Sequence, residues 1–361
     1  MKFLLIILSI SILTFFGFYV SKPENVPQLP DKLDISNKFD PTTDAGGIQD
    51  EVYVSPISVN SLRSKVFQNT DLTIESTLSR GSNYSRFIAS YTSDGNKIYG
   101  LLTIPDAEPP EGGFSAIVFN HGYIPPSQYR TTEKYLAYVD TLARNGFVVF
   151  KIDLRGHGES EGIPTGSYFS PGYTIDALYA LKALQTRSDV NPKRIGMWGH
   201  SMAGNLVLRA MLVSDEIKAG VIWAGAVYSY KDFGEYRLND NSYSAQRTPQ
   251  PDDPRLEGLR ENSPEIRKMR EDPESVDFSS DFWKSISLTQ NLNYLNSPIQ
   301  LHHSVNDDVV NVGYSRDLVT EAELQDKDIT LYEYSGGGHN INSPYFEQAI
   351  QRTVDFFKEN L

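Results

Sequence analysis

Short, continuous apolar segments that alternate with helical patterns restrict the fold of this chain more than any other feature. Five such segments end at turn residues, and they span residues 115–120, 147–153, 194–198, 219–223 and 299–302. Segments that are apolar on both faces are typical of parallel strands covered by helices on each side of a sheet. Helical patterns separate most of them, at residues 133–145, 174–186 and 202–213. The alternation predicts an α/β fold with a mostly parallel central sheet flanked by helices.

Two stretches depart from this alternation. Residues 86–91 and 97–104 are strand-like and flank the turn sequence Ser93-Asp94-Gly95-Asn96, which predicts a hairpin at the start of the sheet. Residues 228–296 are polar, contain several prolines and include no core-strand pattern. We interpret this second stretch as an inserted cap over the active-site edge of the sheet.

The N-terminus carries a membrane-targeting pattern. Residues 3–20 are uncharged and nearly all apolar, and at about 1.5 Å per helical residue they almost span a bilayer core of about 30 Å. No convincing pair of small residues marks a cleavage site, which favours an uncleaved anchor over a signal peptide. A buried core helix is disfavoured because the following stretch is polar and proline-rich.

The sequence thus predicts three parts. Residues 1–21 form a transmembrane anchor or signal peptide, residues 22–65 a tether, and residues 66–361 one folded domain that includes the insertion. The domain is expected outside the cytoplasm, anchored to the membrane, or secreted if the N-terminal segment is cleaved.

Composition excludes several classes of function. The net charge of −13 opposes binding to nucleic acid, and no dense cluster of Lys and Arg reverses it locally. The absence of cysteine excludes a disulfide framework, a thiolate nucleophile and a thiolate metal site. His302 and His303 are adjacent and no His-Glu-x-x-His motif is present, so metal catalysis has no support and no cofactor is expected.

The strongest local motif runs from Arg194 to Gly204. A core strand enters Gly199-His200-Ser201-Met202-Ala203 and continues into a helix through small residues. A serine on such a sharp strand-to-helix turn projects its hydroxyl, and the helix N-terminus favours developing negative charge. The usual motif is Gly-x-Ser-x-Gly, and Ala203 stands at the position of its last glycine. Ser201 is therefore the predicted nucleophile.

Candidate partners for Ser201 follow it along the chain. Asp307 leaves the strand at 299–302, and Val310, returning to the core, favours Asp307 over its neighbour Asp308. Asp232 and Glu235 are lesser alternatives for the acid. His339 follows a strand and the glycines at 336–338, which would let its imidazole reach the serine as general base.

The second oxyanion donor is expected after the strand at 115–120. This strand enters the turn His121-Gly122-Tyr123, so the predicted donors are the backbone N–H groups of Tyr123 and Met202. His121 precedes the serine, whereas in hydrolases with this serine motif the chain order is serine, acid, histidine. We assign supporting roles to His121 and to His157, which lies in a polar loop after residues 147–153.

These residues, together with the segments 97–102 and 153–158, resemble the catalytic domain of the prolyl oligopeptidase and acylaminoacyl-peptidase family. The resemblance covers roughly residues 85–360 and implies an α/β-hydrolase fold and covalent acyl-enzyme chemistry. Too few residues precede the domain for the β-propeller found in the larger members of that family.

The resulting expectation is a serine hydrolase that cleaves an acyl bond in a peptide or a small acyl substrate. The family resemblance favours a peptidase. A carboxylesterase is the alternative, because the same triad serves both reactions. A membrane-tethered binding protein on an inactive hydrolase fold is disfavoured, since every triad residue is present.

Overall fold

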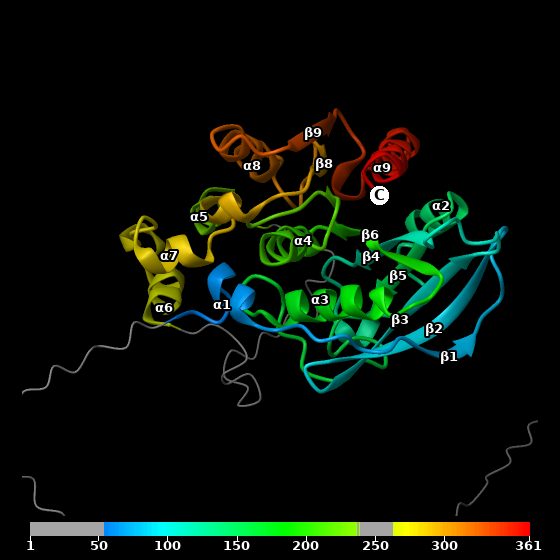
Figure 1. Cartoon of the computed structure of the whole chain (residues 1–361). Helices are drawn as coiled ribbons and strands as arrows, with labels where there is room; N and C mark the ends of the chain where they lie inside the picture. Colours follow the sequence, from blue (N-terminus) through cyan, green and yellow to red (C-terminus); the bar gives the residue numbers. More distant parts are fainter. Residues whose placement is uncertain (1–53, 237, 239–262) are drawn as a thin grey trace, which may run out of the picture. The chain divides into compact units, whose positions relative to one another are not determined.

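The computed structural model describes residues 54–236, 238 and 263–361. They contain a nine-stranded sheet with the order β1-β2-β3-β5-β4-β6-β7-β8-β9 (Figure 1). The strands are β1 (Thr73–Thr77), β2 (Tyr84–Ser93), β3 (Asn96–Pro105), β4 (Phe114–Asn120), β5 (Val148–Ile152), β6 (Val190–His200), β7 (Gly220–Trp223), β8 (Ile299–Ser304) and β9 (Ile329–Tyr334). From β5 to β9 all neighbouring strands are parallel, and β1, β2 and β3 add antiparallel pairs. The predicted α/β fold is confirmed.

Burial explains why the central strands read as unbroken apolar runs. Every residue of β4, β5, β7 and β8 is buried, whereas every residue of the edge strand β1 is exposed. The predicted hairpin forms between β2 and β3, where Ser93 pairs with Asn96. Its two-residue turn holds Asp94 and Gly95 at φ values of 48° and 81°, the left-handed conformation that a tight hairpin turn needs.

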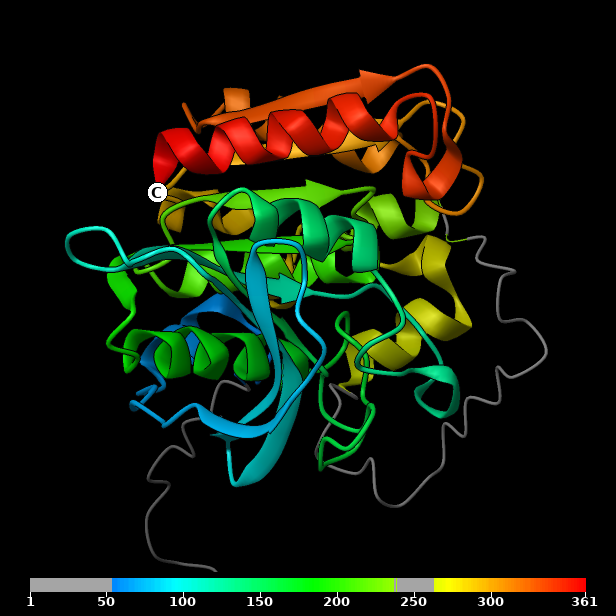
Figure 2. The same ribbon diagram turned by 90° about the vertical axis from the view of Figure 1, so that its right-hand side faces the viewer.

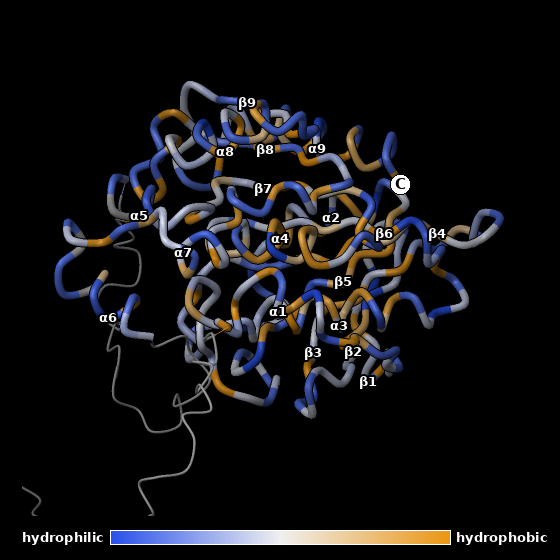
Figure 3. The backbone as a smooth tube through the Cα atoms, turned by 60° about the vertical axis from the view of Figure 1, so that its left-hand side comes forward, coloured by the Kyte–Doolittle hydropathy of each residue, from blue (hydrophilic) through white to orange (hydrophobic). Residues whose placement is uncertain are grey.

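Helices cover both faces of the sheet (Figures 1 and 2). One hydrophobic cluster joins one face to helices that include α1, α3 and α4, and a second joins the other face to α2 and α9. Hydrophobic residues accordingly concentrate in the central strands and in the helices packed on them (Figure 3). The helices are α1 (Val59–Ser64), α2 (Leu136–Arg144), α3 (Gly172–Gln185), α4 (Met202–Val213), α5 (Tyr230–Tyr236), α6 (Pro264–Glu271), α7 (Asp281–Ile286), α8 (Gly313–Glu323) and α9 (Phe346–Asn360).

The folded unit begins earlier than the predicted boundary at residue 66. Residues 57–64 belong to the core, because Ile57, Val59 and Leu62 are buried. The fully buried Arg209 of α4 donates a hydrogen bond to the Ile57 carbonyl at 2.5 Å. The pattern was missed because α1 is only six residues long and lies in a proline-rich context.

The predicted anchor at 1–21 and most of the predicted tether lie outside the described residues. Among the helices at 54–236 and 263–361, none has the length and apolar character needed to cross a bilayer.

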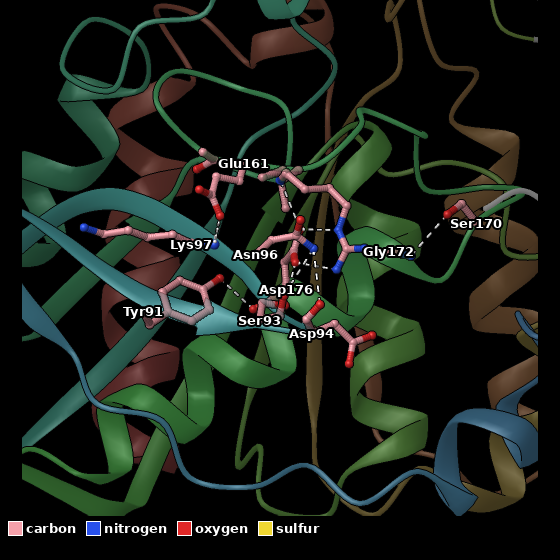
Figure 4. A network of polar contacts seen from close by, with 12 residues as sticks. Tyr91, Ser93, Asp94, Asn96, Lys97, Glu161, Ser170, Gly172 and Asp176 are labelled. Atoms are coloured by element: carbon pink, nitrogen blue, oxygen red, sulfur yellow. Dashed lines mark hydrogen bonds and ion pairs between the residues drawn. The ribbon is translucent and has the colours of Figure 1, made fainter. Parts of the chain in front are cut away.

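A buried ion pair joins the loop after β5 to α3, and the hairpin donates hydrogen bonds to the same acidic residue (Figure 4). Arg155, in the loop after β5, donates to both carboxylate oxygens of Asp176, at 3.0 Å from Nε and 2.7 Å from Nη2. Ser93 donates to the same carboxylate at 2.7 Å, and Tyr91 donates to the Asp176 carbonyl at 2.7 Å. The Asp176 side chain has no exposed surface, so its charge depends on these donors.

Replacing Arg155 by methionine is expected to lower the free energy of unfolding by about 3–5 kcal/mol, because it leaves a buried carboxylate without its cation. Arg316→Met is the matched control. Arg316 pairs with Glu333 at 2.7 Å, but its side chain is 52% exposed, so its loss should cost less than about 1 kcal/mol. Denaturant unfolding of both variants measures the difference, and equal losses would contradict the assigned role of the buried pair.

Candidate active site

Ser201 occupies the sharp turn that the motif predicts. Its backbone adopts φ 56° and ψ −121°, an unfavourable conformation for a residue with a side chain. The turn is held in place because the Ser201 N–H donates to the Trp223 carbonyl at 2.9 Å and the Gly204 N–H donates to the Ser201 carbonyl at 2.8 Å. Strained backbone retained by its surroundings is typical of a nucleophile elbow.

The departure from the usual motif at Ala203 is accommodated. Ala203 is fully buried at the start of α4. The need for glycine falls on the next residue, because a Cβ on Gly204 would lie 2.6 Å from the Cα of Gly225. Helix α4 therefore approaches the segment after β7 closely at Gly204, and alanine is tolerated one position earlier.

Asp307 and His339 are brought together at the ends of neighbouring strands. Asp307 follows β8 and His339 follows β9, and the two strands are parallel. The His339 Nδ1 lies 2.8 Å from Asp307 Oδ2. A carboxylate can only accept, so Nδ1 carries the proton and Nε2 of the neutral ring is left as an acceptor.

The environment of Asp307 keeps its carboxylate charged. Burial alone would raise its pKa, but hydrogen bonds from His303 and His339 and a backbone donor hold the pKa well below its usual range. The other oxygen, Oδ1, accepts from the backbone N–H groups of Val309 and Val310, both at 2.9 Å. Val310 is buried, as the motif predicts.

The alternative acids lie elsewhere. Asp308 is exposed, although it is adjacent to Asp307. Asp232 lies on α5, where burial and then the charge of Asp317 raise its pKa to about 7. Glu235, on the same helix, is exposed. Among these acids, Asp307 is the one that accepts a hydrogen bond from His339.

Ser201 and His339 line one cavity of about 300 Å³. Its wall comes from three parts of the chain: residues 122–138, the pair His200 and Ser201, and residues 339–342. The cavity thus lies at the carboxyl ends of the parallel strands, where ligands bind in open α/β sheets. Its volume lies at the lower end of the range of about 300–1,000 Å³ that is usual for small-ligand pockets.

A family model described as serine aminopeptidase, S33, matches residues 114–343, which is well over half of the chain and includes Ser201, Asp307 and His339. The chain belongs to this family.

Curated relatives and solved structures resemble parts of this chain, and the solved structures show the same fold. The uncharacterized protein YfhR of Escherichia coli O157:H7 is 29% identical over 161 residues, which cover 42% of this chain. The chain spans only 53% of that curated relative's length. An acetyl xylan esterase from Paenibacillus sp. R4 has a TM-score of 0.58 at 18% identity, covering 82% of this chain and 91% of the esterase. The acylaminoacyl peptidase of Pyrococcus horikoshii has a TM-score of 0.59 at 16% identity. The match covers 78% of this chain and 42% of the peptidase.

The chain thus belongs to a family described as serine aminopeptidases, and the predicted resemblance to acylaminoacyl-peptidase-like enzymes is confirmed at the level of the α/β-hydrolase fold. The solved neighbours include both esterases and peptidases.

The predicted cap does not contribute to the cavity in its described part. Residues 230–236 and 264–294 form short helices as α5, α6 and α7 with 3₁₀ turns, and none of their side chains lines the cavity. Six of the residues that line the cavity instead belong to the loop after β4 and the start of α2, between positions 122 and 138. Residues 237 and 239–262 of the insertion lie outside the described residues. A long loop after β4 was not recognised as a wall because its few apolar residues show no periodicity.

The two predicted oxyanion donors lie on the segments that follow β6 and β4. Met202 is the first residue of α4, and the first N–H groups of a helix have no acceptor within that helix. Tyr123 lines the cavity and follows Gly122, whose own N–H donates to the Tyr135 hydroxyl at 3.0 Å.

His121 and His157 are structural neighbours of this wall. Both are buried and their rings lie 5.0 Å apart, and burial lowers the pKa of each. The His157 ring lies between two loops, with Nε2 3.1 Å from the Ile124 carbonyl and Nδ1 3.2 Å from the Leu154 carbonyl. Within residues 54–236, 238 and 263–361, no three His, Asp or Glu side chains are grouped as metal ligands.

Three polar residues around the site were not identified from the sequence. His303 Nδ1 lies 2.7 Å from the Ser315 hydroxyl, and its Nε2 donates to the Val310 carbonyl at 2.9 Å and lies 3.3 Å from Asp307 Oδ2. The Asn306 side chain accepts from the Gly338 N–H at 3.0 Å and so holds the glycine-rich loop. Tyr135 contacts both Gly122 and His200. Only the position of His303, four residues before the acid, carried any sequence signal.

Proposed function

We propose that this serine hydrolase cleaves an ester or amide bond through a covalent acyl-enzyme, with Ser201 as nucleophile, His339 as general base and Asp307 as the orienting acid. The observation that carries the proposal is the 2.8 Å hydrogen bond from His339 Nδ1 to Asp307, on a histidine that lines the same cavity as Ser201.

In the first half of the reaction, the Ser201 Oγ attacks the carbonyl carbon and its proton passes to His339 Nε2. The carbonyl oxygen becomes an oxyanion, which the N–H groups of Met202 and Tyr123 would stabilise. The bond to the leaving amine or alcohol then breaks, and His339 returns the proton to that group. In the second half, water attacks the ester carbon of acylated Ser201, and the same proton transfers release the acid.

A peptide substrate is proposed first, because the chain belongs to a peptidase family. An ester of a small acid is the second candidate. The share of each solved structure that the match covers supports this second candidate. That share is 91% of the acetyl xylan esterase but 42% of the acylaminoacyl peptidase. The cavity of about 300 Å³ also suits a small acyl group. We also propose that residues 1–21 hold the enzyme at a membrane with its catalytic domain outside the cytoplasm.

One experiment separates the two substrate classes. The full-length chain is given an ester and an amide that share one acyl group, and kcat/KM is measured for both, with Ser201→Ala as the blank. A peptidase should cleave the amide at a rate well above the blank, whereas an esterase should cleave only the ester. Turnover by the blank equal to that of the unaltered enzyme would contradict the proposed function itself.

A further inference from the structure

A line of hydrogen bonds runs across the cavity from the loop after β4 to the loop after β9. The Gly122 N–H lies 3.0 Å from the Tyr135 hydroxyl, and this hydroxyl lies 2.8 Å from His200 Nδ1. On the far side of the same ring, His200 Nε2 lies 3.0 Å from the carbonyl oxygen of His339. The line therefore begins one residue before a predicted oxyanion donor and ends on the backbone of the predicted base.

The chemistry of the end groups fixes the direction of every bond. The His339 carbonyl can only accept, so His200 Nε2 carries the proton. Nδ1 of the neutral ring is then an acceptor, and the Tyr135 hydroxyl must donate to it. The lone pairs of that hydroxyl accept the Gly122 N–H. All three bonds are satisfied at once by one tautomer of His200.

His200 is well suited to stay in this single state. Burial, followed by the nearby His339, lowers the pKa of His200 to about 3. Its ring centroid lies 4.6 Å from that of His339, so a charged His200 would disfavour the imidazolium that forms on the base during turnover. A neutral ring avoids this repulsion and still donates to the base's own backbone.

The local backbone also indicates that Tyr135 is held for a purpose beyond filling space. Tyr135 adopts the left-handed conformation, with φ 61° and ψ 23°, which is uncommon for a large aromatic residue. It does so immediately before α2, and this turns the phenol toward Gly122 and His200. Strained residues of this kind persist only where the surroundings hold them and are concentrated at functional sites.

We propose that Tyr135 and His200 are positioning residues that lock the loop carrying the Tyr123 N–H to the loop carrying His339. This inference rests on the proposed function of Ser201 and His339. Without the link, each loop would still fold, but the oxyanion donor and the base would no longer be held at one fixed separation. A misplacement of about 1 Å at a reacting group can cost on the order of 100-fold in rate.

The test uses Tyr135→Phe, His200→Phe and the double variant, with kcat and KM measured on an ester substrate. Each single variant is expected to lower kcat about 10–100-fold while KM changes less than about threefold, because the geometry of reaction is lost and not the cavity. The kcat of the double variant should lie within about threefold of the kcat of the slower single variant. Both changes break the same chain of hydrogen bonds, so their effects should not multiply.

Two further variants serve as a rescue and as a control. His200→Gln keeps one hydrogen-bond donor and one acceptor, both in the terminal amide. It should recover part of the kcat that is lost in His200→Phe. Tyr84→Phe is the matched control, because the Tyr84 hydroxyl donates to Asp140 of α2 at 2.8 Å and has no part in the cavity. It should leave kcat unchanged.

The outcomes are distinct. If the two phenylalanine variants fall in melting temperature but keep kcat within twofold, or if their effects on kcat multiply, the positioning role is wrong. If Ser201→Ala remains as active as the unaltered enzyme, the proposed function fails instead, whatever the result at Tyr135 and His200.

Discussion

Ser201→Ala is expected to lower kcat by a factor on the order of 10⁴–10⁶. Removing Oγ abolishes the covalent route, and the activity that remains would come from binding and the oxyanion donors alone. The fold should persist, because the turn is held by backbone bonds from Ser201 N–H and to the Ser201 carbonyl, which alanine retains.

A fluorophosphonate probe provides a second readout that does not depend on knowing the substrate. An activated serine should displace fluoride and form a stable phosphonyl ester, and peptide mass analysis should place the adduct on residue 201. Ser279→Ala is a suitable control, because Ser279 is an exposed serine outside the cavity. Labelling of another serine, or full turnover by Ser201→Ala, would contradict the assignment.

Much of the fold could be predicted because its signals are local. The core strands are short apolar runs, and the turn at Asp94-Gly95 has the chemistry of a two-residue hairpin. The elbow was predicted because a strand, a serine and small residues lie within a few positions of one another. Asp307 and His339 were predicted from chain order and from the ends of strands, and the structure brings them within 2.8 Å.

Other features depend on contacts that no local pattern records. Helix α1 is short and owes its place to burial against α4 and to Arg209, which lies far along the chain. His200 occupies the variable position of the motif, and its partner is a backbone carbonyl, which looks the same at every residue. The cavity wall at 122–138 is irregular, so its role appears only when the chain is folded.

Asp307→Asn is expected to lower kcat by a factor on the order of 10³–10⁴. The asparagine oxygen can still accept from Val309 and Val310, as Oδ1 of the acid does. The amide NH₂ would then face His339 Nδ1, where the carboxylate of Asp307 now accepts a hydrogen bond. Two donors cannot share that contact, so His339 would move its proton to Nε2. In this tautomer the ring cannot accept the serine proton.

The matched control is Asp308→Asn, which makes the same chemical change at the adjacent, exposed residue. Its kcat should stay within about twofold of the unaltered enzyme. The labelling rate of Ser201 by the fluorophosphonate probe should fall with kcat in Asp307→Asn, because both require His339 to accept the serine proton. Equal losses in the two variants would mean that general loss of carboxylate charge matters, whereas loss at Asp308 alone would reassign the acid. A loss of kcat confined to Asp307→Asn would show that the rate depends on the tautomer of His339. The hydrogen bond between the Asp307 and His339 side chains controls that tautomer.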